Sequence, residues 1–164
     1  MPVLSGGCLC GALRYEARSP PLRVTLCHCR FCQRVTGSSH LVEPLFDRDD
    51  LRVTSGQPAT YRHRSEGSGK PVDLHFCATC GTMLFMTFER FPGLCGVSAG
   101  TLDDPACIEV RPDNAKQVFV ASARPDAVLL PGLNTFAGPA IDEAGRPHLP
   151  LVHDAPHIVG RRRS

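Results

Sequence analysis

Seven of the nine cysteines in this 164-residue chain fall in three short clusters, and this grouping is the feature most able to do chemistry. The clusters are Cys8 with Cys10, Cys27 with Cys29 and Cys32, and Cys77 with Cys80. Zinc prefers thiolate ligands in tetrahedral geometry, and C-x-C or C-x-x-C spacing lets neighbouring sulfurs reach one ion. An odd number of cysteines cannot form a closed disulfide framework. The pattern therefore predicts two zinc ions rather than disulfide bonds.

The number of thiols in the clusters indicates that the two zinc sites differ. Two pairs supply four sulfurs, which close one site completely and make it a structural staple. The triplet supplies only three sulfurs. Three protein ligands with an exchangeable fourth position are typical of catalytic zinc. Such an ion could bind a substrate thiol, lower its pKa and hold it as the nucleophilic thiolate.

Several alternatives to this assignment stay open from the sequence. The two pairs could be buried thiols or a redox pair, and the triplet could be an empty site or a second structural site completed by another residue. His28 is one candidate for that missing ligand, although in an extended C-x-C it points away from the neighbouring sulfurs. The isolated Cys95 and Cys107 are expected to be small buried hydrophobic residues.

Short segments with alternating polarity are expected to position the clusters. Residues 13–18, 22–26 and 72–76 alternate between apolar and polar, which predicts strands with Leu13, Tyr15 and Ala17 facing inward in the first. The other two run directly into Cys27 and Cys77. Further strands are predicted at residues 41–46, 51–54, 59–63, 82–88, 94–98 and 117–122. Residues 30–36 are expected to form one or two helical turns that end at Gly37.

Composition supports an all-β domain built from about nine short strands with little helix. The 15 glycines, 15 prolines, 6% aromatic content and absence of tryptophan favour turns and short strands over long helices. A domain over residues 1–135 is predicted, followed by a Pro/Gly/His-rich tail over residues 136–164 that is partly ordered at best.

Charge and hydropathy limit the classes of partner. A net charge of +2, with no basic stripe, is too small to argue for nucleic-acid binding. No run approaches the roughly 18 apolar residues needed to span a bilayer, and the N-terminus has no signal-peptide pattern. We therefore expect a soluble protein in the reducing cytoplasm, where closely spaced cysteines are more often metal ligands than disulfides.

The cysteine motifs and their neighbours resemble the glutathione-dependent formaldehyde-activating (GFA) family. The matching motifs are Gly7-Cys8-Leu9-Cys10-Gly11 with Tyr15, Cys27-His28-Cys29 with Cys32, and Phe76-Cys77-Ala78-Thr79-Cys80-Gly81-Thr82. Residues 99–105 and 118–122 also resemble this family, and the resemblance covers about residues 3–133. Three ordered cysteine motifs make it specific.

The resemblance implies a fold, a ligand assignment and an activity. The fold is the zinc-binding β-tent, made of short antiparallel strands and also found in small-GTPase chaperones and centromere protein V. The implied ligands are Cys8, Cys10, Cys77 and Cys80 for the structural ion and Cys27, Cys29 and Cys32 for a second ion next to a glutathione site. The implied activity joins formaldehyde to glutathione, giving S-(hydroxymethyl)glutathione, and is classed as a carbon–sulfur lyase.

The main hypothesis is a zinc-dependent enzyme that acts on a small thiol and an aldehyde, with the triplet as its catalytic residues. Glutathione carries two carboxylates, and guanidinium groups bind carboxylates well. Arg30 and Arg34 flank the triplet and are the first candidates to bind glutathione, whereas Arg62, Arg64 and Lys70 are weaker candidates. The loops over residues 62–72 and 88–96 are expected to shape a pocket.

Two competing hypotheses give the cysteines another role. In the first, the chain is a non-catalytic, zinc-stapled β module that binds a protein partner. In the second, Cys29 and Cys32 form a redox sensor, because oxidised thiolates would eject the metal. The missing fourth ligand favours the enzyme, since a binding module has no need for an incomplete site.

Overall fold

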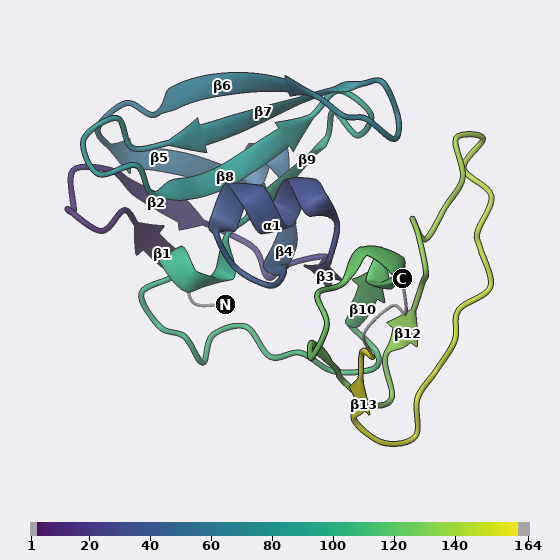
Figure 1. Cartoon of the computed structure of the whole chain (residues 1–164). Helices are drawn as coiled ribbons and strands as arrows, with labels where there is room; N and C mark the ends of the chain where they lie inside the picture. The colour runs from purple at the N-terminus through teal and green to yellow at the C-terminus, as the bar shows by residue number, and fades with distance from the viewer. Residues whose placement is uncertain (1–2, 161–164) are drawn as a thin grey trace. The chain divides into compact units, whose positions relative to one another are not determined.

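The computed structural model describes residues 3–160, which are mostly β-sheet with one short α-helix (Figure 1). The expected all-β class is therefore confirmed. The chain divides into two compact units, Met1–Arg23 with Glu43–Glu109 and Val24–Val42 with Val110–Ser164. Each cysteine cluster lies within one unit. No helix among the described residues has the length and apolar character needed to cross a membrane.

The first unit contains two groups of antiparallel strands. One is ordered β1-β2-β5, with bounds Leu4–Gly7, Arg14–Ala17 and Leu51–Ser55. The other runs β4-β9-β8-β7-β6. Its strands are β4 (Leu41–Asp47), β6 (Ala59–Arg64), β7 (Pro71–Phe76), β8 (Met83–Phe88) and β9 (Leu94–Val97). Two 3-10 turns, η1 (Arg48–Asp50) and η2 (Ala99–Thr101), complete this unit.

The core of the first unit explains the alternating pattern of its strands. Leu13, Tyr15 and Ala17 are all buried, as their spacing predicted, because alternate residues of a strand point to the same face. They pack in one cluster with Phe46 and Val97. Large side chains from both groups of strands thus form one hydrophobic core.

The second unit pairs short strands in parallel, an arrangement that the sequence did not indicate. Strand β10 (Ala115–Val118) lies parallel to both β3 (Arg23–Cys27) and β12 (Asn134–Thr135). The buried Gln117 side chain exchanges hydrogen bonds with Leu130, donating to its carbonyl at 3.1 Å and accepting from its amide at 2.8 Å. This amide therefore ties β10 to the loop that follows it.

The helix predicted after Cys29 is present with the predicted bounds, as α1 (Arg30–Thr36). Cys29 is its N-cap, and the Cys29 sulfur accepts a hydrogen bond from the backbone amide of Cys32 at 3.3 Å. Gly37 ends the helix with a left-handed φ of 64°, which glycine adopts without steric cost.

The late strand ends earlier than its sequence suggested. It was predicted over residues 117–122, but β10 stops at Val118, and Phe119 has a φ of 58°. A left-handed residue cannot continue an extended strand. The next three residues form the 3-10 turn η3 (Val120–Ser122) instead.

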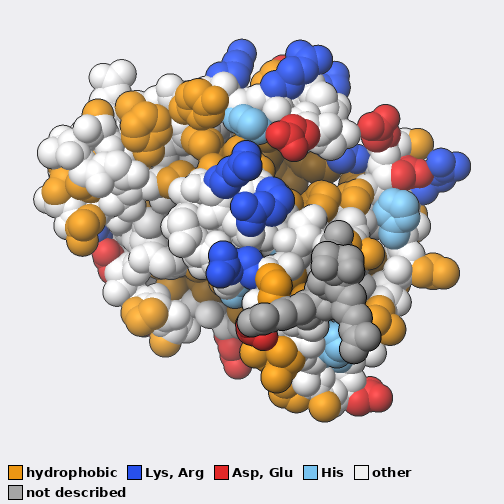
Figure 2. Space-filling model, in the orientation of Figure 1, with side chains coloured by type: hydrophobic (Ala, Val, Ile, Leu, Met, Phe, Trp, Pro, Cys, Tyr) orange, Lys and Arg blue, Asp and Glu red, His pale blue; other side chains and the backbone are white. Residues whose placement is uncertain are grey.

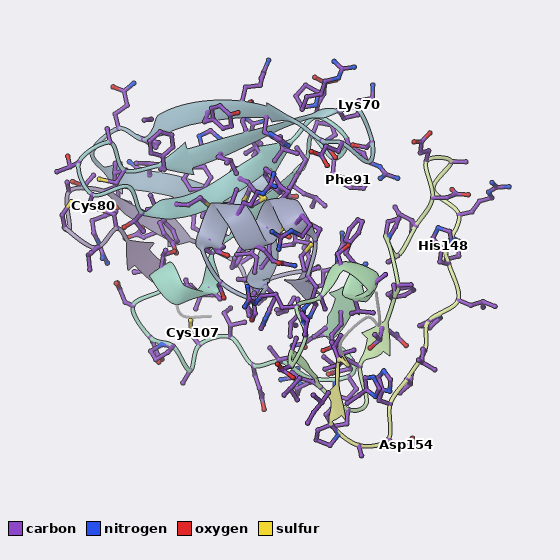
Figure 3. All side chains as sticks on the ribbon, viewed as in Figure 1. Lys70, Cys80, Phe91, Cys107, His148 and Asp154 are labelled. Atoms are coloured by element: carbon purple, nitrogen blue, oxygen red, sulfur yellow. The ribbon has the colours of Figure 1, made fainter. Side chains whose placement is uncertain are left out.

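The C-terminal segment makes regular backbone contacts within the second unit. Its strand β13 (His157–Ile158) pairs with β11 (Val128–Leu129), and Leu151 and Thr135 exchange two backbone hydrogen bonds. Figure 3 shows the long course of this segment past His148 and Asp154. The predicted domain boundary near residue 135 stays a prediction.

The close packing of β1 on β2 predicts that Gly6→Ala destabilises the protein. A Cβ atom at Gly6 would meet the Tyr15 hydroxyl and would lie 2.6 Å from the Thr101 carbonyl oxygen. We expect the free energy of unfolding to fall by about 1–3 kcal/mol in urea denaturation, the usual cost of overpacking. The control is Gly100→Ala, where an added Cβ meets nothing within 4 Å. Equal stability of the two variants would contradict the prediction.

Candidate metal centres

Four cysteine sulfurs converge in the first unit, from two segments far apart in the sequence. The sulfurs of Cys8, Cys10, Cys77 and Cys80 all lie within 4.8 Å of one another. The Cys8–Cys10 and Cys10–Cys77 sulfur distances are 3.5 and 3.7 Å. Tetrahedral zinc with Zn–S bonds of about 2.3 Å separates its sulfurs by about 3.8 Å. The cluster, called here the four-cysteine cluster, therefore fits such an ion.

Two similar tight turns present these sulfurs. In each, the amide of a glycine donates to the carbonyl of the first cysteine, Gly11 to Cys8 at 3.0 Å and Gly81 to Cys77 at 2.8 Å. Both glycines have φ near 75°, a region that favours glycine. The amide of Leu13 donates to the Cys8 sulfur at 3.2 Å, a contact that stabilises thiolate.

Thr82 is a functional neighbour that the sequence analysis missed. Its hydroxyl lies 3.2 Å from the Cys80 sulfur and also accepts from the Leu9 amide at 3.2 Å. This hydroxyl therefore links the two turns. The Thr82 hydroxyl and backbone lower the pKa of Cys80 to about 5, which favours the ligand form of the sulfur. Thr82 lies two residues after Cys80, but its bond to Leu9 crosses 73 positions and needs the folded chain.

The η2 turn and Asp103 after it anchor strand β2, which follows the first turn. The Tyr15 hydroxyl lies 2.7 Å from the Thr101 hydroxyl, and burial raises the pKa of Tyr15 to about 12, so the phenol stays protonated. The Arg14 guanidinium binds both carboxylate oxygens of Asp103 and lowers the pKa of that group. These contacts give a structural reason for the sequence pattern around Thr101 and Asp103.

The second group of sulfurs belongs to Cys27, Cys29 and Cys32, called here the triplet. They come from the end of β3 and the start of α1, and they also lie within 4.8 Å of one another. Strand β10 holds the junction, because the His28 amide donates to the Val118 carbonyl at 3.0 Å. Among residues 3–160, no fourth histidine, cysteine or carboxylate joins this group. The three sulfurs thus fit an ion with one coordination position left for another ligand.

The three thiols of the triplet differ in pKa because they lie so close together. Hydrogen bonds from Cys27 and then Cys32 lower the pKa of Cys29 to about 3. The same contacts raise the pKa of the other two, with Cys29 as the main cause for Cys27 and Cys27 as the main cause for Cys32. At neutral pH the Cys29 sulfur is therefore a thiolate, and Cys27 and Cys32 keep their protons. A metal ion that bound all three sulfurs would displace both protons.

Gln33 is a second neighbour that the sequence analysis missed. Its side chain is 5% exposed, and its Nε2 donates to the carbonyls of His28 at 2.6 Å and Ser122 at 2.9 Å. Its Oε1 accepts from the Arg30 guanidinium. One buried amide therefore ties the backbone between two triplet cysteines to η3 and holds Arg30 on the first turn of α1.

His28 does not join the triplet, although it lies between two of its cysteines. Its ring stacks on His40 with centroids 4.8 Å apart, and it is 1% exposed. Burial, followed by the charge of His40, lowers the pKa of His28 to about 4. Both ring nitrogens lack a hydrogen-bond partner among the described residues. The neutral ring is thus a packing group of the second unit.

The other candidate arginines and the two isolated cysteines lie outside both cysteine clusters. Arg34 is exposed on α1, and Arg62 binds Asp73 across the β6–β7 pair. Figure 2 shows basic side chains along the β6 edge at the top of the view. Cys95 is buried as predicted, whereas Cys107 is only half-buried. Neither of these two cysteines belongs to a cluster of possible ligands within the described residues.

Fold and site together define a mostly β-sheet protein with two separate cysteine clusters, each able to hold a metal ion such as zinc. The sequence profile of the glutathione-dependent formaldehyde-activating enzymes matches residues 3–122, about three quarters of the chain. The chain belongs to this family.

Two known proteins illustrate the similarity. A Halomonas elongata protein, whose name assigns it provisionally to the glutathione-dependent formaldehyde-activating enzymes, is 31% identical over 104 residues. The alignment covers 62% of this chain and 66% of that protein, slightly less than two thirds of its length. The crystal structure of a Rhodobacter sphaeroides protein has a TM-score of 0.51 at 27% identity and covers 65% of this chain and 96% of that one.

Replacing a ligand of the four-cysteine cluster should remove one metal ion. We expect Cys80→Ser to bind one zinc equivalent fewer than the unchanged protein and to unfold at lower urea concentration, because metal binding contributes directly to folding. Elemental analysis and urea denaturation measure the two effects. Cys107→Ser is the control, since Cys107 is also half-buried but lies outside both clusters. A full metal content in Cys80→Ser would refute the assignment.

Metal affinity should weaken as pH falls. Cys27 and Cys32 have raised pKa values, so both carry protons at neutral pH that an incoming ion must displace. Lower pH favours the protonated thiols, and we expect Co²⁺ to bind less tightly at about pH 5.5 than at about pH 7.5. The thiolate-to-cobalt absorption band measures binding. In Cys29→Ser the triplet should lose its ion and the band should keep about four sevenths of its height, because four of the seven thiolates remain. Affinity that does not change with pH would contradict thiol coordination.

Proposed function

We propose that this protein is a zinc-dependent carbon–sulfur lyase-type enzyme that joins formaldehyde to the thiol of glutathione. The observation that carries the proposal is the unequal division of thiols between the clusters, four in one and three in the other. A complete set of four sulfurs has no position for a substrate, whereas a set of three does. Membership of the family and the name of the Halomonas relative support glutathione and formaldehyde as substrates.

The triplet supplies the site for the thiol. Zinc held there would offer an open coordination position that lowers the pKa of a bound thiol. The chain keeps the position open in two ways. The Cys32 amide fixes the Cys29 sulfur at the helix N-cap, and the stacking of His28 on His40 keeps that imidazole away from the sulfurs.

Arg30 is the residue best placed to recognise glutathione. Its guanidinium is exposed next to Cys29 but is held by the buried Gln33 side chain. A guanidinium with a fixed orientation loses less entropy when it binds a carboxylate. Arg34, one turn further along α1, would supply a second positive charge. The two arginines together suit a peptide with two carboxylates.

The reaction balances without an oxidant, a reductant or a further reactant. The glutathione thiol gives up its proton, and the sulfur electron pair forms a C–S bond to the formaldehyde carbon. The carbonyl π pair moves to oxygen, which takes the proton and becomes the hydroxyl of S-(hydroxymethyl)glutathione. In the reverse direction the C–S bond breaks and formaldehyde leaves, which is the lyase reaction.

Two variants separate chemistry from recognition. Cys29→Ala should lose one metal equivalent, and adduct formation should fall to the uncatalysed rate. Arg30→Gln should keep both metal ions and kcat but raise KM for glutathione about tenfold, the loss expected for one charged hydrogen bond. Exchange of ¹³C-formaldehyde into the adduct, followed by NMR, measures the rate of adduct formation and its dependence on glutathione concentration. Elemental analysis measures the metal content. Arg52→Gln, on exposed β5, is the control.

One result would favour the competing function. If Cys29→Ala loses its metal ion but forms the adduct as fast as the unchanged protein, the triplet has no catalytic role. The chain would then be better described as a zinc-stapled β module that binds a protein partner.

A further inference from the structure

A concave pocket lies at one end of the β6–β7–β8 sheet, in the first unit. It encloses about 290 Å³, enough for a small metabolite. Figure 3 shows Lys70 and Phe91 at this end of the sheet and Cys80 at the opposite end. The pocket is thus remote from the four-cysteine cluster. Its apolar lining residues are Pro71, Phe88 and Pro92.

The polar lining residues Arg62, Asp73 and Thr87, called here the floor of the pocket, are held in place by hydrogen bonds. Arg62 and Asp73 face each other in the β6–β7 register and form two bonds of 2.7 and 2.8 Å. The Arg62 guanidinium lowers the pKa of Asp73, so the pair stays ionised and its charges cancel. The Thr87 hydroxyl is fixed by His75 Nε2 at 3.1 Å, and that ring stacks on Phe85.

Arg48 contributes a positive charge to the pocket. It lines the pocket from η1, and no carboxylate among the described residues forms an ion pair with it. Its charge acts on the floor, because it adds to the lowering of the pKa of Asp73, a smaller effect than that of Arg62. A guanidinium with free donors at a concave site suits a ligand carboxylate.

Glu89 contributes a negative charge on the same pocket. Within residues 3–160 it forms an ion pair with Lys70 at 3.9 Å, and both side chains are more than half exposed. An exposed pair at this distance contributes little and is easily exchanged for another cation. The Glu89 carboxylate is therefore available to a ligand ammonium group.

We propose that this pocket binds the α-amino-carboxylate group of an amino acid or of a peptide with such an end. Arg48 would bind the carboxylate, Glu89 the ammonium group, and Phe88 with the two prolines the methylene carbons. The ion-paired floor would add no net charge, which suits a zwitterion better than a dianion. Two sources share this chemistry, a free amino acid such as glutamate and the γ-glutamyl end of a glutathione molecule separate from the one proposed at the triplet.

The test is calorimetric binding to the zinc-loaded protein in the absence of aldehyde. We expect the protein to bind L-glutamate, and we expect Arg48→Gln to weaken the affinity for L-glutamate at least about tenfold. Glu89→Gln should weaken the binding of L-glutamate but not the binding of glutarate, which lacks the ammonium group. Arg52→Gln is the matched control. Absence of saturable L-glutamate binding, or equal weakening of that binding by Arg52→Gln, would overturn the proposal.

Glutathione distinguishes the two sources. If Arg48→Gln weakens glutathione by the same factor as L-glutamate, and cysteinylglycine is unaffected, the pocket takes the γ-glutamyl end. If Arg48→Gln weakens the binding of L-glutamate but not of glutathione, the ligand is a free amino acid. Because no aldehyde is present, failure here leaves adduct formation by the triplet untouched, and loss of adduct formation in Cys29→Ala leaves this binding intact.

Discussion

The convergence of three thiols at the junction of β3 and α1 is the constraint on which the rest of this protein depends. Three sulfurs this close cannot all ionise without a cation, as the opposed pKa shifts of Cys29 and Cys32 indicate. The backbone must therefore hold the three sulfurs in place for an ion. Pairing of His28 with β10, the helix cap at Cys29 and the buried Gln33 amide do so.

The four-cysteine cluster meets a different requirement. Its two turns are each closed by local backbone bonds, so each pair of sulfurs is oriented by its own turn. What joins them is tertiary, because the Thr82 hydroxyl accepts a hydrogen bond from the Leu9 amide of the other turn. A closed set of sulfurs at this point would stabilise the strands that carry the two turns, whereas the triplet would leave one coordination position for another ligand.

Much of the site could be predicted because the chemistry is local in sequence. The C-x-C and C-x-x-C spacings, the glycines after each pair and the helix stop at Gly37 are all short-range, and each matches the structure. The alternation that buries Tyr15 and Ala17 is equally local. The parallel pairing of β10 and the end of that strand at Phe119 were not predictable, because strand partners are chosen by packing of distant segments.

The sequence by itself determined which residues can bind metal and which elements carry them, since ligand type, spacing and periodicity are properties of neighbouring residues. Only the tertiary structure decided which neighbours control those ligands. Gln33 reaches Ser122, and Thr82 reaches Leu9, across 89 and 73 positions. Arg48 and Glu89 meet at one pocket for the same reason. Such contacts depend on how the strands pair, which no local pattern encodes.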